Sequence, residues 1–250
     1  MIRLLAVDDS ALMRRLIGEV FADGADVEVA IARNGVEARA QLEAFRPDVI
    51  TLDVHMPQMD GLACLDRIMI ERPCPVVMVS ALTAEGARET VDALALGAVD
   101  FIPKPGGAIS LKLDVFGPVL VDKVRAASQA RLARTHRLAE RVRLRSGGAG
   151  REPRVFAPGS ARPPALAPLP GDRAGRVVLV GSSTGGPPAL DALLAPLPAD
   201  FPWPIVVAQH MPATFTGALA SRLDRLCALS VREVAAPTTL LPGGVYIGRG

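Results

Sequence analysis

Residues 49–61 decide the fold of the first half of this chain: they read Val49-Ile-Thr-Leu-Asp53-Val-His-Met-Pro57-Gln-Met-Asp-Gly61. The apolar run at the start of this stretch ends directly in Asp53, and a loop containing proline and glycine follows. Short apolar runs bounded by turn residues are typical of strands buried on both faces, as in parallel sheets. The stretch therefore predicts a buried strand that carries Asp53 at its carboxyl end.

Similar apolar runs lie on both sides of this strand, and amphipathic patterns separate them. The runs are Leu4–Val7, Val27–Ile31, Val49–Leu52, Val76–Val79 and Phe101–Ile102; the amphipathic patterns are Ala11–Phe21, Val36–Phe45, Leu62–Glu71 and Glu85–Leu96. Alternating strands and helices predict an α/β fold with a doubly wound parallel sheet.

A further helix is expected over roughly 117–144, because Pro118 suits a first helical turn and helix formers follow it. The end of this helix, Arg131–Arg145, is strongly basic. We expect a solvated helix leading into a linker rather than a nucleic-acid arm, since no aromatic residues are interleaved to stack on bases. Residues 146–175 are rich in glycine and proline without apolar periodicity, which predicts a linker.

The strand–helix alternation resumes at Arg176. The expected strands are Val177–Val180, Ile205–Ala208 and Val245–Ile247, and the expected helices run through Leu190–Leu194 and Thr214–Leu226. The sequence thus predicts three parts: one domain over 1–130, a basic helix end with a linker over 131–175, and the start of a second, incomplete α/β domain over 176–250.

Composition limits the possible functions. The chain has 250 residues, half of them apolar, and a net charge of +2, so no global basic field indicates nucleic acid. Its three cysteines are too scattered for a disulfide framework or a metal motif, and we expect a reducing compartment. The sequence has no apolar run of about 18 residues, so we expect no membrane insertion. Asp8 and Asp9 interrupt any signal-peptide pattern.

Charged and hydroxyl side chains follow the predicted strands of the first domain. Asp8 and Asp9 come after the first strand, Asp53 ends the third, Ser80 follows the fourth and Lys104 follows the fifth. Because ligands bind beyond the carboxyl ends of the strands in an open parallel sheet, these residues are expected at one edge. Any one of these acids alone would be explained as a helix cap or a solvated charge. That explanation does not account for the whole set at successive strand ends.

The residue types fit phosphoryl chemistry. Three clustered carboxylates repel one another and require a hard divalent cation, and Mg²⁺ prefers oxygen ligands. An aspartate carboxylate can attack phosphorus and form an acyl phosphate. An ammonium group such as that of Lys104 then helps to neutralise the phosphoryl oxygens.

These motifs resemble the response-regulator receiver family over residues 1–105. The matching segments are Val-Asp8-Asp9-Ser, Asp53-Val-His-Met-Pro57-x-Met-Asp-Gly61, Ser80-Ala and Phe101-Ile-Pro-Lys104-Pro. The resemblance implies a flavodoxin-like fold in which Asp53 accepts a phosphoryl group from a histidine kinase. It implies that Asp8, Asp9, Asp53 and the backbone carbonyl of His55 bind Mg²⁺. It also implies that Ser80 and Phe101, with Lys104 beside them, report phosphorylation.

A second constellation is the segment Gly181-Ser182-Ser183-Thr184-Gly185-Gly186, which follows a predicted strand and opens a predicted helix. Three interpretations fit it: a capping turn, a phosphate cradle on helix amides, or a sharp turn that presents a nucleophilic serine. His210 ends the next strand, so both Ser183 and His210 are expected at the same sheet edge. A histidine there could act as general base for the serine.

This half resembles the catalytic domain of the chemotaxis protein-glutamate methylesterases, the CheB family. The segments that carry the resemblance are Gly-x-Ser183-Thr184-Gly-Gly, Gln209-His210-Met-Pro212 with Phe215-Thr216, and Leu241-Pro-Gly-Gly-x-Tyr-Ile. The resemblance implies a cytoplasmic hydrolase that acts on methyl-accepting chemoreceptors and also deamidates their glutamines. Ser183 takes the place of the nucleophile, His210 that of the base, and Thr184 that of its supporting neighbour, with no cofactor for the esterase.

The chain departs from that family in one respect. The family's third catalytic residue is an aspartate in a Gly-Met-Gly-x-Asp-Gly segment, which is absent here, and neither Asp191, Asp200 nor Asp224 lies in such a motif. The alternative function is therefore a truncated, inactive phospho-receiver that serves as a binding module or phosphate sink. A DNA-binding regulator is disfavoured, because nothing after residue 146 resembles a recognition helix.

Overall fold

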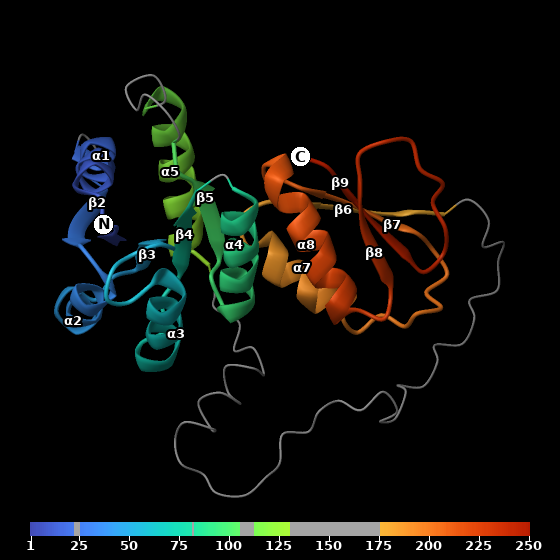
Figure 1. Ribbon diagram of the computed structural model, residues 1–250, viewed down its shortest axis with the longest axis horizontal. Coiled ribbons are helices and arrows are strands. Elements are labelled where there is room, and N and C mark those ends of the chain that lie inside the picture. Colours follow the sequence, from blue (N-terminus) through green and yellow to red (C-terminus); the bar gives the residue numbers. More distant parts are fainter. Residues whose placement is uncertain (23–25, 82, 106–112, 131–175) are drawn as a thin grey trace, which may run out of the picture.

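The computed structural model describes residues 1–22, 26–81, 83–105, 113–130 and 176–250, which build two parallel sheets (Figure 1). The first half contains β1 (Ile2–Val7), α1 (Ala11–Ala22), β2 (Val27–Ala32), α2 (Gly35–Phe45), β3 (Val49–Asp53), α3 (Gly61–Glu71), β4 (Val76–Ser80), α4 (Ala84–Leu96), β5 (Asp100–Pro103) and α5 (Leu113–Ser128). Its five strands are parallel and ordered β2-β1-β3-β4-β5, which confirms the predicted doubly wound sheet.

Helices cover both faces of this sheet, so its strands are apolar on both sides. Alternate residues of β1 illustrate the two layers: Leu4 packs with the buried faces of α1 and α5, and Leu5 with those of α2, α3 and α4. Side chains cap the starts of α2, α3 and α4, where Asn34, Asp60 and Thr83 accept a backbone N–H from the first turn. These caps fix where each helix begins after its strand.

The second half contains β6 (Val178–Ser182), α7 (Gly186–Leu194), β7 (Ile205–Gln209), α8 (Ala213–Leu226), β8 (Ser230–Val234) and β9 (Gly244–Gly248). The four strands are parallel, in the order β6-β7-β9-β8. Helices α7 and α8 cover one face, burying Leu190 and Leu219 against Val207 and Ile247. On β6, Leu179 is 74% exposed.

The structure corrects two expectations about elements. Helix α5 begins at Leu113 rather than near 117, so Pro118 lies inside the helix and not in its first turn. The edge strand β8 was not predicted, because Arg232 and Glu233 interrupt its apolar pattern. The expected basic helix end and linker over 131–175 lie outside the described residues.

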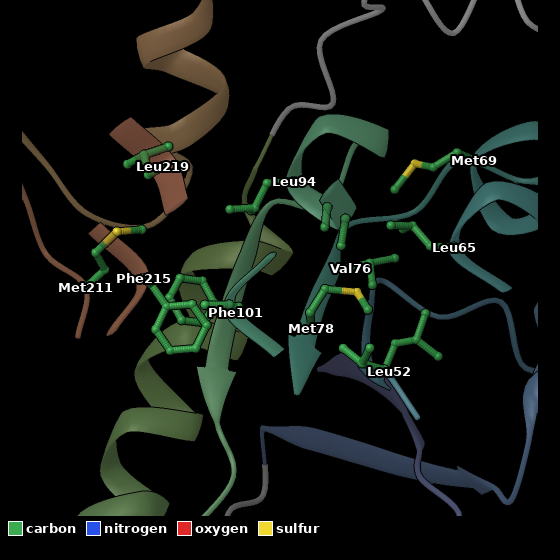
Figure 2. Close-up of a cluster of buried hydrophobic side chains, with 14 of the residues drawn as sticks. Leu52, Leu65, Met69, Val76, Met78, Leu94, Phe101, Met211, Phe215 and Leu219 are labelled. Carbon is green, nitrogen blue, oxygen red and sulfur yellow. The ribbon is translucent and has the colours of Figure 1, made fainter. Parts of the chain in front are cut away.

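The two halves share one hydrophobic core. Helix α4 of the first half packs along α8 of the second, and both lie between the two sheets (Figure 1). Phe101 of β5 and Phe215 of α8 stack with ring centroids 4.4 Å apart, and Figure 2 shows Met211 beside them and Leu94 near Leu219. All five of these residues are almost fully buried, so this contact is a packed interior rather than a surface encounter.

The cysteines behave as small apolar residues. Cys64 and Cys74 are buried in the first half, and burial raises the pKa of each thiol to about 12. Cys227 is partly buried at the end of α8, and burial raises the pKa of its thiol as well. All three are free, as the sequence led us to expect. Among the described helices, none is both long and apolar enough to span a membrane.

Candidate functional site

The acidic cluster forms at the carboxyl edge of the first sheet. Asp8 follows β1 and Asp53 ends β3, and both residues are only 1% exposed, while Asp9 is exposed. One carboxylate oxygen from each of the three lies within 4.8 Å of the others. The parallel register of β1 and β3 places the ends of the two strands side by side, so the sheet itself brings these acids together.

Lys104 supplies the positive charge of this cluster. Its Nζ lies 2.6 Å from Asp53 Oδ2 and 3.2 Å from Asp8 Oδ2. Burial raises the pKa of Asp53, and the opposing effect of Lys104 does not cancel it. Burial, with the charge of Asp53, also raises the pKa of Asp8. Burial alone would lower the pKa of Lys104, but its contacts with Asp53 and Asp8 raise it. One ammonium group thus leaves the carboxylates incompletely neutralised.

The acidic cluster fits a hard divalent cation. Asp8 Oδ2 is buried and accepts no hydrogen bond within the described part of the chain, although Lys104 Nζ lies 3.2 Å away. The donors are all carboxylate oxygens, the ligand class that Mg²⁺ prefers. The backbone of His55 adjoins them, with its N–H 3.3 Å from Asp53 Oδ1. The ring of His55 points elsewhere and pairs with Glu89 of α4 at 3.0 Å, so it lies away from the carboxylates.

The expected switch residues contact α4 and the second half rather than Asp53. The buried hydroxyl of Ser80 donates to the carbonyl of Gly86 in the first turn of α4, 3.2 Å away. The ring of Phe101 lies against Phe215 of α8. Both residues therefore connect the acidic edge to the boundary between the halves.

The serine-rich turn joins β6 to α7 at the carboxyl edge of the second sheet. Gly185 is the N-cap of α7 and has a φ of 74°, a left-handed conformation that glycine adopts without steric cost. Among the described residues no side chain caps this helix, so the interpretation of the segment as a Ser/Thr capping turn is wrong. Thr184 is half-buried in the turn beside the exposed Ser183.

The backbone of this turn also argues against a phosphate cradle. Such a site needs free N–H groups at the helix N-terminus. Here Gly185 N–H donates to the carbonyl of Val99 and Gly186 N–H to that of Ser183, and the next two residues are Pro187 and Pro188, which have no N–H. The first turn of α7 therefore has few donors left for an anion.

Ser183 and His210 meet, as the sequence predicted. His210 follows β7, and its backbone N–H donates to the carbonyl of Ser182, which continues the pairing of β7 with β6. As a result, Ser183 Oγ lies 3.2 Å from His210 Nδ1. An open cleft of about 570 Å³ surrounds the pair. When Ser183 donates to Nδ1, the neutral ring carries its proton on Nε2. This arrangement can activate a serine hydroxyl through a histidine base.

Gln209 is a site residue whose role the sequence did not reveal. Its side chain is 5% exposed, and its amide bonds to Ser182, to Ser183 and more weakly to His210. The available signal was an amide at the end of an otherwise apolar strand. Of the acids considered for a third catalytic residue, Asp191 pairs with Arg222 of α8, and Asp224 accepts the N–H of Val231.

Comparison with known families agrees with this two-part architecture. Residues 4–115 match the family described as "Response regulator receiver domain", and residues 178–250 match the family described as "CheB methylesterase".

Individual relatives match the whole chain. It is 57% identical to "Protein-glutamate methylesterase/protein-glutamine glutaminase 2" of Rhodopseudomonas palustris, over 100% of this chain and 68% of that protein. It is 52% identical to the corresponding protein 3 of Rhodospirillum rubrum, over 100% of this chain and 66% of that protein. The crystal structure of the response regulator domain of Thermotoga maritima CheB is 44% identical, covers 52% of this chain and 98% of its own, and has a TM-score of 0.49. The chain spans about two thirds of the length of these full-length relatives.

Proposed function

Because this chain belongs to the CheB family of protein-glutamate methylesterases, we propose that it hydrolyses glutamate methyl esters, and deamidates glutamines, on chemoreceptors under the control of its receiver half. The observation that carries the proposal is the 3.2 Å contact between Ser183 Oγ and His210 Nδ1 at the open edge of the second sheet. Both residues are exposed, so their side chains lie at the surface of the molecule.

The proposed reaction is acyl transfer through Ser183. Its Oγ attacks the ester carbonyl carbon as His210 Nδ1 takes the hydroxyl proton. Collapse of the tetrahedral intermediate breaks the bond to methoxide, which leaves as methanol with the proton from His210. Water, deprotonated by the same histidine, then attacks the glutamyl–serine ester and releases the free carboxylate and Ser183. In deamidation, ammonia leaves in place of methanol.

Thr184 contributes through its backbone in this proposal. It follows the nucleophile directly at a strand-to-helix turn, and the N–H at that position helps to form the oxyanion hole in hydrolases built on such a turn. Fixed N–H donors stabilise the charge that develops on the carbonyl oxygen.

The test of this reaction removes the nucleophile. Methanol release from methyl-labelled chemoreceptor is measured with the 250-residue chain and with a chimera in which the corresponding later part of the Rhodopseudomonas palustris relative follows Gly250. We call whichever of these two forms releases methanol the hydrolytically active form. In it, Ser183→Ala should lower the rate by roughly 10³-fold or more, since losing a serine nucleophile removes most of the rate enhancement. Equal rates for parent and variant would rule the assignment out.

We further propose that Asp53 accepts the phosphoryl group of a histidine kinase in the cytoplasm. A carboxylate oxygen of Asp53 attacks phosphorus, and the bond from phosphorus to the kinase histidine breaks. Lys104, already 2.6 Å from Asp53, is placed to bind a phosphoryl oxygen. Asp8, Asp9, Asp53 and the carbonyl of His55 would hold Mg²⁺, which neutralises the charge of the incoming group.

The need for metal follows from the charge of the cluster. At about 4 Å and an effective dielectric near 20, each like-charge pair costs on the order of 4 kcal/mol. A chelator should therefore abolish labelling of Asp53 by a small-molecule phosphodonor, and Asp9→Ala should slow it. Asp53→Ala should abolish base-labile phosphate even at saturating Mg²⁺; labelling of this variant at the parent rate would contradict the assignment of the phosphorylated residue.

The contacts between the halves support control of the esterase by the receiver. Ser80 and Phe101 connect the acidic edge to α4 and to Phe215. In addition, the carbonyl of Val99 in the receiver half accepts the N–H of Gly185, two residues after the nucleophile. We propose that this packed arrangement is the restrained state and that phosphorylation releases it.

A further inference from the structure

We propose that Gln209 is a positioning residue for the esterase: its buried amide fixes the serine turn and the histidine in the geometry that the reaction needs. This inference rests on the proposed function, because it names a residue that acts through Ser183 and His210 rather than on the substrate. Gln209 is the last residue of β7, directly before His210, and is paired in register with Ser182.

The amide uses both of its ends. Ser182 Oγ donates to Gln209 Oε1 at 2.6 Å, and Gln209 Nε2 donates to the carbonyl of Ser183 at 3.0 Å and to that of His210 at 3.4 Å. Backbone carbonyls only accept hydrogen bonds, so this orientation of the amide is the one that satisfies every partner. One side chain therefore joins both residues of the reacting pair through their backbones.

The surroundings of Gln209 allow it little freedom. The side chain is only 5% exposed, so its polar atoms rely on these protein partners. A Cβ placed on Gly186 would come 2.0 Å from Gln209 Oε1 and 2.8 Å from its Cδ. Gly186 is the first residue of α7 and its φ is not in the left-handed region, so the glycine is required there by the amide and not by the backbone.

The contact between Ser183 and His210 needs such support because the pair itself is exposed. Water competes with an exposed hydrogen bond, and a side chain without a fixed backbone samples several rotamers. A displacement of about 1 Å at reacting groups can lower a rate by roughly 10²-fold. By holding the carbonyls of both residues, Gln209 keeps Oγ and Nδ1 at bonding distance.

Two variants of similar size test the role of the amide. Gln209→Met removes every hydrogen bond of the side chain. Gln209→Glu keeps an oxygen that can accept from Ser182 Oγ, but its second oxygen faces the carbonyl oxygens of Ser183 and His210 and repels them. In the hydrolytically active form, both should lower kcat about 10- to 100-fold with KM changed less than about twofold. Ser182→Ala, which leaves the two Nε2 bonds in place, should have a smaller effect, and the exposed Gln129→Met should have none.

A second measurement does not depend on turnover. The chain has three histidines, so the imidazole nitrogens of His210 can be assigned by NMR in the 250-residue protein. The parent should show essentially only the Nε2–H tautomer that donation from Ser183 to Nδ1 requires, and Ser183→Ala should relax toward the mixture of a free imidazole, in which Nε2–H is the larger but not the sole form. Gln209→Met should shift His210 toward the mixed tautomers of a free imidazole, with the fold intact by circular dichroism.

Gly186 provides the decisive double mutant. Gly186→Ala should lower kcat like Gln209→Met, but should cost little further in a Gln209→Ala background, where the amide it would meet is absent. Unchanged kcat and tautomer in the Gln209 variants, or an equal penalty for Gly186→Ala in both backgrounds, would overturn the proposal. Retained hydrolysis in Ser183→Ala would instead overturn the proposed function, and the tautomer would still decide the role of Gln209.

Discussion

At the scale of single residues, the acidic cluster of the receiver is held together with an unfavourable charge balance. Within the described residues, two buried aspartates and one exposed aspartate face Lys104. A carboxylate whose pKa is raised by folding binds a proton more readily in the native state than in the unfolded chain. The stability that Asp8 and Asp53 contribute is therefore present at low pH and is lost as the pH rises above the ordinary aspartate value of 3.8.

The raised pKa of Asp53 predicts how stability changes when the charge of this residue is removed. At neutral pH and with a chelator present, Asp53→Asn should raise the melting temperature by roughly 2–4 °C, corresponding to about 1 kcal/mol. Mg²⁺ should stabilise the parent more than the variant, because the variant has lost a charged ligand. The exposed Asp122→Asn serves as the matched control in thermal denaturation. A lower melting temperature for Asp53→Asn would mean that its contact with Lys104 outweighs the cost of burial.

Some site residues could be predicted and others could not, for a physical reason. Asp53 ends a strand, and Asp8, Lys104, Ser183 and His210 each follow one. Parallel strands bring their carboxyl ends to one edge of a sheet. The sequence therefore placed these side chains together. The role of Gln209 depends instead on the rotamer of one side chain and on the turn beside it, which no spacing along the chain encodes.

At the scale of elements, the start of α3 shows how tightly the loop after Asp53 is packed. A Cβ on Gly61 would come 2.1 Å from the carbonyl oxygen of Asp53, whereas a Cβ on Gly18 of α1 would meet nothing within 4 Å. Both glycines lie in helices and neither has a positive φ. Gly61 is the first residue of α3 and Gly18 lies inside α1, but the larger difference between them is the space around them.

This difference gives a matched pair of substitutions. Gly61→Ala should destabilise the protein by about 1–3 kcal/mol or more, because backbone must move to admit the methyl group. Gly18→Ala should stabilise it by roughly 0.5–1 kcal/mol, because alanine loses less backbone entropy in a helix. Urea denaturation measures both. Similar changes in the two variants would show that helix propensity, not packing, governs these positions.

The elements that the sequence analysis missed share a weak apolar signal. In β8 only Val231 is fully buried, and the strand lies at the sheet edge, so charged residues are tolerated there. The start of α5 was misplaced because Pro118 suits a first turn, yet the helix continues on its N-terminal side. By contrast, strands buried on both faces, such as β3, were predicted almost to the residue.

At the scale of the whole molecule, the two halves share one hydrophobic core. Side chains of the receiver therefore help to bury side chains of the second half. Phe215 and Leu219 of α8 are fully buried, and α4 and Phe101 of β5 pack against α8 in this core (Figure 2). Release of the receiver must therefore expose apolar surface, which opposes opening. Phosphorylation can shift this equilibrium only by the difference in free energy that it creates between the packed and released states.

Deleting the receiver should have the effect of releasing it. Removal of residues 1–146 from the hydrolytically active form should raise methanol release by roughly 5- to 150-fold, the usual range of coupling between sites. Asp53→Asn in the intact form should keep the basal rate and no longer respond to a phosphodonor. Steady-state assays with and without the phosphodonor measure both. Equal rates for the deleted and the intact unphosphorylated forms would remove the restraint from the proposal.

The buried thiols of Cys64 and Cys74 can report how often the structure around them opens. With a pKa of about 12, Cys64 and Cys74 are thiolates in only about one molecule in 10⁴ at pH 8, and both are shielded from reagents. An alkylating agent can therefore modify them only when α3 or the start of β4 opens, so the rate of labelling counts those openings. Cys227, partly exposed at the end of α8, should react earlier, because its labelling needs no such opening. The order in which Cys64 and Cys74 gain mass would then tell whether α3 or the start of β4 opens first.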